Sequence, residues 1–151
     1  MDNAGTFFSK DTTDAVVITC LSFRFRSLTE AAVLRTFGIK DYDLISLAGG
    51  AKNISSPGFA SRRRAVMSDI ALAVEKHRVG RIILLNHQTC SKYAAAGHVF
   101  GVSERERERQ FHYGELREAG RRTKKKFPDA EVLLGYLAVT SGGVVIESVV
   151  A

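Results

Sequence analysis

The sequence lacks the features that define several classes of protein. Only two cysteines occur in 151 residues, and Cys20 and Cys90 are far too widely separated to form a CxxC redox pair. No apolar run approaches the roughly 20 residues that span a bilayer, and the first residues, MDNAGTFFSKDTTD, lack the basic and apolar regions of a secretory signal. We therefore expect a cytoplasmic protein whose reduced thiols are available for metal binding or nucleophilic chemistry.

The chain also shows no linker, internal repeat or low-complexity tract. Its length favours a single domain over residues 1–151, and 45% hydrophobic with 25% charged residues is typical of a globular protein. The net charge of +6 raises the question of a nucleic-acid partner. However, SERERERQ (103–110) alternates in sign like a solvated helix face, and RRTKKK (121–126) ends the same predicted helix, where cations suit the helix dipole. We expect ordinary surface charge here, with a polyanion site as the alternative.

Short apolar runs alternate with helical patterns along the chain. Strands are predicted at 14–20, 42–50, 81–86, 130–140 and 143–150. Helices are predicted at 27–38, where Ser27 and Glu30 have capping-box spacing, at 58–80 and at about 103–126, with a broken helical region after the third strand. Alternating strands and helices form parallel βαβ units. The expected fold is α/β, a mostly parallel doubly wound sheet flanked by helices, with the last strand antiparallel at the edge.

Three residues with metal-binding side chains follow two of the predicted strands. In common doubly wound sheets the first strand lies beside the third, and ligands bind at the carboxyl ends of the strands. This arrangement places Cys20 next to His87 and Cys90. Two thiolates and an imidazole are donors that zinc prefers, and three protein ligands leave the open fourth position of a catalytic site. The alternative is a core or capping His87 and two cysteines that act as small buried hydrophobes.

These motifs, in this order, resemble those of the β-class carbonic anhydrases. C-x-x-x-R stands at residues 20–24, Ala-Gly-Gly at 48–50 and H-x-x-C at 87–90. The resemblance covers about residues 14–149. It implies the fold of that family, with the last two strands as its terminal pair.

The resemblance also implies a function and a ligand set. Cys20, His87 and Cys90 would bind Zn²⁺, and zinc-bound hydroxide would convert carbon dioxide reversibly to bicarbonate. The family commonly forms dimers or tetramers through N-terminal helices and sheet edges, so a homo-oligomer is expected. The segment before the first strand is short and polar, which implies that the usual N-terminal arm is missing or reduced.

The sequence departs from the family at a residue next to the first cysteine. Arg24 matches an arginine that in the family pairs with an aspartate, but that aspartate is replaced by Ser22. A serine hydroxyl can exchange hydrogen bonds but is a poor base at neutral pH. We expect Ser22 to position the nucleophile and Arg24 to orient or stabilise the anion. Asp41 or Asp43 is the alternative partner of Arg24.

Other polar residues near these motifs have plainer interpretations. After the second cysteine, SKY (91–93) replaces the glycine usual in the family. Lys92 is expected to be a solvated helix-start residue, with positive potential near the metal as the alternative. The glycines of 48–50 are expected to serve the turn, with anion contact through their N–H groups as the alternative. His98 and His112 are expected to be ordinary helix or loop residues, with a proton shuttle as the alternative for His98.

Three functions follow as hypotheses. The first is a carbonate dehydratase, or an enzyme of the same chemistry acting on another small electrophile such as a carbon–sulfur analogue of carbon dioxide. The second is a zinc-binding relative without hydratase activity, with a structural or anion-binding role. The third, a basic nucleic-acid-binding module, is the least favoured.

Overall fold

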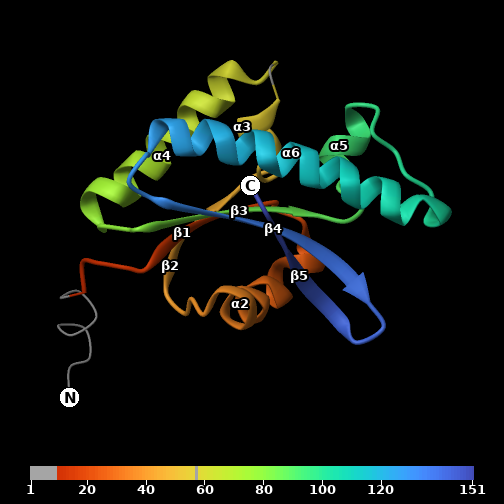
Figure 1. Ribbon diagram of the computed structural model, residues 1–151, viewed down its shortest axis with the longest axis horizontal. Coiled ribbons are helices and arrows are strands. Elements are labelled where there is room, and N and C mark those ends of the chain that lie inside the picture. The colour runs from red at the N-terminus through yellow and green to blue at the C-terminus, as the bar shows by residue number, and fades with distance from the viewer. Residues whose placement is uncertain (1–9, 57) are drawn as a thin grey trace.

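A five-stranded sheet forms the centre of the protein (Figure 1). The computed structural model describes residues 10–56 and 58–151, so residues 1–9 of the predicted N-terminal segment lie outside the described part. The sheet has the order β2-β1-β3-β4-β5, in which β4 and β5 are antiparallel and the other pairs are parallel. This confirms the predicted fold class. The strands are β1 (Ala15–Thr19), β2 (Tyr42–Ser46), β3 (Arg81–His87), β4 (Glu131–Thr140) and β5 (Gly143–Val149).

Helices cover both faces of the sheet. In Figure 1, α2 lies on one face, and the remaining helices lie on the other. The bounds are α2 (Phe23–Phe37), α3 (Lys52–Ser55), α4 (Ala60–Lys76), α5 (Ser91–Ala95) and α6 (Arg105–Lys126), which a 3-10 turn, Val102–Glu104, precedes. Among the described residues, no helix combines the length and the apolar character that crossing a membrane requires.

The two helical layers bury opposite sides of the same strands. Side chains alternate along a strand, so Val16 and Ile18 of β1 pack with Ile70 of α4, whereas Val17 packs with Val33 of α2. All five residues of β1 are buried. The continuous apolar run that predicted this strand therefore reflects a sheet covered on both faces.

Helix α2 begins four residues before the predicted start. Ser27 was predicted to cap it, but the helix begins at Phe23, with Ser22 at the N-cap and no side-chain cap hydrogen bond. The reason is tertiary packing: Phe25 is buried in the core beneath the sheet, and it extends the apolar stripe of the helix upstream of the Ser27–Glu30 pair. Burial of this aromatic ring outweighs a local capping signal.

Candidate metal centre

The parallel pairing of β1 and β3 brings the predicted ligands together. Ala15 pairs with Arg81 and Ile18 with Leu84, so both strands end at the same edge of the sheet. Cys20 directly follows β1, His87 is the last residue of β3, and Cys90 precedes α5. Their ligand atoms all lie within 4.8 Å of one another. The expectation that these residues lie together at the carboxyl ends of β1 and β3 is therefore confirmed.

The distance between the two sulfur atoms fits a shared metal ion. Cys20 Sγ and Cys90 Sγ are 3.9 Å apart, and both cysteines are free thiols. Two thiolates bound to one tetrahedral zinc, each at about 2.3 Å, would lie about 3.8 Å apart. A disulfide would bring them to about 2.05 Å. The spacing thus matches metal ligands without further movement of the sulfur atoms.

The imidazole of His87 contributes one nitrogen, Nε2, to the same cluster as the two sulfur atoms. Its Nδ1 lies 2.7 Å from the carbonyl oxygen of Gln88, so Nδ1–H donates and Nε2 carries the lone pair. Nε2 is buried and has no hydrogen-bond partner among the described residues. A buried imidazole nitrogen is costly to leave unpaired, and a metal ion would satisfy it. The donor set Cys-His-Cys is therefore one into which zinc fits.

The close contact of the two thiols shifts their pKa values in opposite directions. The hydrogen bond from Cys90, supported by the Gly49 N–H group, lowers the pKa of Cys20 despite burial. The same hydrogen bond and burial raise the pKa of Cys90. Because metal ligands must be deprotonated, metal bound by both sulfurs would displace the proton of the Cys90 thiol, whose pKa is raised.

A glycine turn supports Cys20 from the side of β2. The N–H group of Gly49 donates to Cys20 Sγ at 3.3 Å. Gly50 has φ +50°, and a Cβ there would lie 2.5 Å from the carbonyl oxygen of Leu85. Asn53 fixes the turn by donating from Nδ2 to the carbonyl oxygens of Ala48 and Gly50, at 2.8 and 2.9 Å. The glycines thus allow the backbone to pass directly against the ends of β1 and β3.

The comparisons with known proteins agree with this geometry. Residues 10–144 match the model of a family described as “Putative carbonic anhydrase”. The chain belongs to this family. The β-carbonic anhydrase isoform I of Trichomonas vaginalis has a similar fold, with a TM-score of 0.57, 11% identity and coverage of 89% of this chain and 83% of that chain.

Two further proteins extend the comparison. A structure from a study of two tetrameric β-carbonic anhydrases of Sordaria macrospora matches with a TM-score of 0.53 and 19% identity, covering 99% of this chain and 88% of that chain. An uncharacterised protein of Rickettsia bellii is 25% identical over 118 residues, which are 78% of this chain and 71% of that protein. The chain is a divergent β-carbonic-anhydrase-like protein.

A cavity of about 380 Å³ adjoins Cys90. Its polar lining includes Arg24, His98, Glu108 and His112, and apolar side chains such as Phe100 complete it. The guanidinium carbon of Arg24 lies 5.3 Å from the centroid of the Phe23 ring. Among the described residues no carboxylate lies within ion-pair distance of Arg24, which therefore differs from the paired arginine that the resemblance implies.

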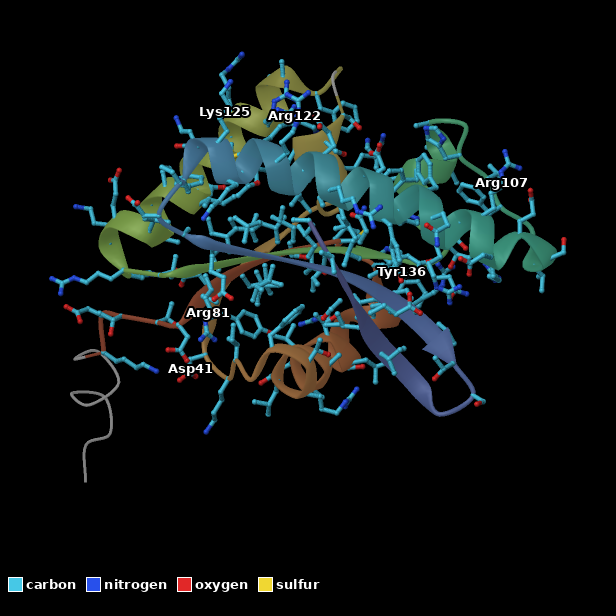
Figure 2. The ribbon with its side chains drawn as sticks, in the orientation of Figure 1. Asp41, Arg81, Arg107, Arg122, Lys125 and Tyr136 are labelled. Atoms are coloured by element: carbon cyan, nitrogen blue, oxygen red, sulfur yellow. The ribbon has the colours of Figure 1, made fainter. Side chains whose placement is uncertain are left out.

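The alternative partners proposed for Arg24 are wrong. Asp41 pairs with Lys10 at 2.6 Å, and Asp43 lies 2.6 Å from His77 Nδ1. Both aspartates flank the start of β2, whereas Arg24 follows the end of β1, at the opposite edge of the parallel sheet. Figure 2 shows Asp41 on the side of the sheet where the strands begin, together with Arg81.

Ser22 and Lys92 take structural positions beside the centre. Ser22 is the half-buried N-cap residue of α2, and its backbone carbonyl accepts a hydrogen bond from the Phe25 N–H group. The stem of Lys92 packs against Gly49, and its ammonium nitrogen lies 5.5 Å from the centroid of the Phe59 ring. Lys92 is thus half-buried over the glycine turn.

Sequence reasoning missed the carboxylate that holds the H-x-x-C loop. Thr89 has φ +55°, a left-handed conformation that is unusual for a residue with a β-branched side chain. Its N–H group donates to the carboxylate of Glu108, which is 2% exposed, and Arg105 Nη1 donates to the same carboxylate at 3.0 Å. Glu108 begins the buried stripe of α6 that continues at His112 and Leu116. This four-residue spacing is the sequence signal that could have distinguished Glu108 from the exposed charges around it.

Proposed function

We propose that the chain is a zinc-dependent enzyme that converts carbon dioxide reversibly to bicarbonate. The observation that carries the proposal is the Cys20–His87–Cys90 cluster, in which a buried imidazole nitrogen has no partner in the described part of the chain and one cysteine borders a cavity. Zinc held by these residues would supply a water nucleophile activated near neutral pH. The membership in the carbonic anhydrase family supports this assignment.

The cavity beside Cys90 suits a small apolar substrate and an anionic product. Ala94, Val99 and Phe100 give it an apolar wall for carbon dioxide. Arg24 lines the same cavity, and its guanidinium can stabilise bicarbonate through charge-assisted hydrogen bonds. Because Arg24 has no carboxylate partner among the described residues, its N–H groups are available to the anion.

Proton handling must differ from that of the family. Ser22 can orient a water molecule by a hydrogen bond but cannot accept its proton at neutral pH. We propose that His98 serves as the proton acceptor, because its imidazole lines the cavity and packs against Phe111 with ring centroids 4.5 Å apart. A zinc-binding protein without hydratase activity is the second candidate, and the replacement of the family's aspartate by Ser22 is the observation that favours it.

Stopped-flow measurement of carbon dioxide hydration by the zinc-loaded protein tests the proposal. We expect hydration above the buffer rate in the wild-type protein and its loss in Cys90→Ser, which lacks one ligand. Ser22→Asp distinguishes the candidates. If the wild-type protein hydrates carbon dioxide only at the buffer rate and Ser22→Asp is much faster, the second candidate is supported and the first is contradicted. If the wild-type protein is active and Ser22→Asp is no faster, the site catalyses hydration without the family's aspartate. A parallel assay with carbon disulfide tests the carbon–sulfur alternative.

We also propose that the chain forms a homo-oligomer. Strands β2 and β5 are the sheet edges, which are surfaces that readily pair with a second chain. The similar Sordaria macrospora proteins are described as tetrameric. Light scattering after gel filtration should give a mass of two or four chains, and a monomer at micromolar concentration would contradict this proposal.

A further inference from the structure

A second cavity, of about 620 Å³, lies between α4 and α6, and its lining is strongly basic. Of the nine described residues that line it, none is acidic and six are cationic: Arg63, Arg64, Arg121, Arg122, Lys125 and Lys126. We call this cavity the basic groove. RRTKKK (121–126), for which the sequence suggested ordinary surface charge or a polyanion site, thus contributes four cations to one concave site together with arginines of α4, whereas SERERERQ (103–110) contributes none of these nine residues.

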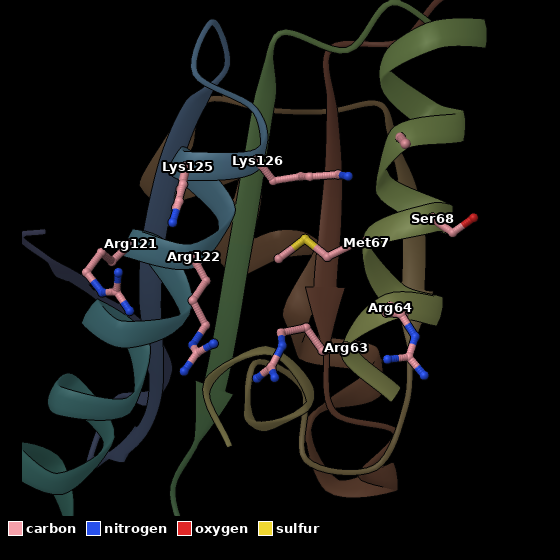
Figure 3. Close-up of a pocket in the computed structure, with 9 residues that line it drawn as sticks. Arg63, Arg64, Met67, Ser68, Arg121, Arg122, Lys125 and Lys126 are labelled. Carbon is pink, nitrogen blue, oxygen red and sulfur yellow. The ribbon is translucent and has the colours of Figure 1, made fainter. Parts of the chain in front are cut away.

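Charged side chains from both helices extend into this space. Figure 3 shows Arg63 and Met67 of α4 opposite Arg122 and Lys126 of α6, and Figure 2 shows Arg122 and Lys125 on the outer surface of α6. Arg63, Met67 and Arg122 are half-buried, so part of the positive charge is withdrawn from bulk solvent. Cations brought together in this way repel one another, and an anionic ligand would relieve the repulsion.

The two facing guanidinium groups are held in place by the protein. Arg63 Nη1 donates to the carbonyl oxygens of Ile54 and Ser56, both at 3.1 Å. Arg122 Nε donates to Glu118 at 2.6 Å. Nη2 of Arg63 and both terminal nitrogens of Arg122 form no hydrogen bond within the described part of the chain. Each arginine therefore has a fixed position and free donors, which reduces the entropy lost when an anion binds.

One carboxylate only partly neutralises the groove. Glu118 accepts hydrogen bonds from both Arg121 and Arg122, which leaves a surplus of five positive charges among the six cations and this one acid. Guanidinium groups bind phosphate oxygens through paired N–H donors, and lysine adds a compact charge. The volume lies in the range of small-molecule sites, and among the described residues no aromatic side chain lines the groove to stack on a base.

We propose that the basic groove binds a small polyphosphate, a ligand with two or three linked phosphate groups. The site uses Arg63 and Arg122 as the central phosphate contacts and Lys126 as a flanking charge. It shares no lining residue with the cavity beside Cys90, so it is a second ligand site rather than a part of the proposed catalytic centre.

Calorimetric titration of the full-length protein with inorganic tripolyphosphate tests this site. We expect one binding site per chain, with affinity about tenfold or more weaker in the double variant Arg63→Gln/Arg122→Gln, because two charge-assisted contacts are lost. The matched control Arg26→Gln/Lys40→Gln removes the same charge from exposed positions outside the groove and should change the affinity less than about twofold. Lys126→Gln, which leaves the Arg63 contacts to α3 intact, should weaken binding without any effect on folding.

Three results would overturn the proposal. Equal weakening of tripolyphosphate binding in the double variant and its control would show that binding depends only on the net charge of the protein. Loss of binding in Cys90→Ser would show that the probe reaches the metal ligands. Finally, the protein could bind a DNA duplex but give no calorimetric response to tripolyphosphate, and tripolyphosphate could fail to displace the duplex. That result would assign the groove to nucleic acid instead.

Discussion

Replacement of Gly50 by alanine should damage the centre more than a comparable change elsewhere. The new Cβ would lie 2.5 Å from the carbonyl oxygen of Leu85 and 3.1 Å from the amide nitrogen of Cys20. Both contacts are with backbone, so no side chain can rotate away. Overpacking of this kind costs about 1–3 kcal/mol, and the left-handed conformation at φ +50° adds about 1–2 kcal/mol for alanine. We therefore expect a loss of about 2–5 kcal/mol in unfolding free energy.

Gly38 provides the matched control. It caps α2 in the left-handed conformation at φ +68°, but a Cβ there would meet no atom within 4 Å. Gly38→Ala should therefore cost only the conformational part, about 1–2 kcal/mol. The difference between the two variants isolates the close approach of the glycine turn to the strand ends.

Two assays check this prediction. Urea unfolding of the reduced, metal-free proteins gives the two free energies, and competition with a chromophoric chelator gives zinc affinity. Gly50→Ala should also weaken zinc binding, because the turn carries the Gly49 N–H group that donates to Cys20 Sγ at 3.3 Å. Equal losses of stability and of zinc affinity in the two variants would refute the argument that this turn shapes the site.

Two further predictions concern buried groups of α6. Glu108→Gln should lower the unfolding free energy by about 1–3 kcal/mol, because the Thr89 N–H group and Arg105 lose a charged acceptor; the exposed control Glu106→Gln should change it little, and similar effects of both would contradict the assigned role. Burial, with the charges of His87 and His98, lowers the pKa of His112 from 6.5 to about 3. The unfolded chain therefore binds the extra proton between these values, so wild-type stability should fall relative to His112→Phe as pH drops below about 6.5, by up to about 1.4 kcal/mol per pH unit. If the unfolding free energies of both proteins, measured with denaturant, changed equally with pH, the assigned effect of His112 would be disproved.

Strand patterns were the most predictable part of the fold. The apolar runs of β1 and β3 indicate burial on both faces, and parallel pairing then places Cys20 beside His87 without any knowledge of the helices. The end of α2 was also predictable from the sequence, because Gly38 adopts the left-handed cap conformation that glycine favours. Its start was not, because the burial of Phe25 depends on a distant part of the sheet.

The surroundings of the site were less predictable than its ligands. The roles of Glu108 and Arg63 depend on contacts between elements far apart in sequence, such as the Glu108 carboxylate with the Thr89 N–H group. Charge alternation around Glu108 concealed its inward position. Asp43 is a different case, because the predicted strand at 42–50 already placed it near the start of β2, away from the strand ends where Arg24 lies.

The central claim is that Cys20, His87 and Cys90 hold zinc. Elemental analysis of protein purified without chelator or added metal, with Cys90→Ser prepared in parallel, tests it most directly. We predict about one zinc ion per chain in the wild-type protein, as three donors and one open position provide one site, and its loss in the variant. Folded wild-type protein that contains no zinc, or a variant that retains the full amount, would contradict the account.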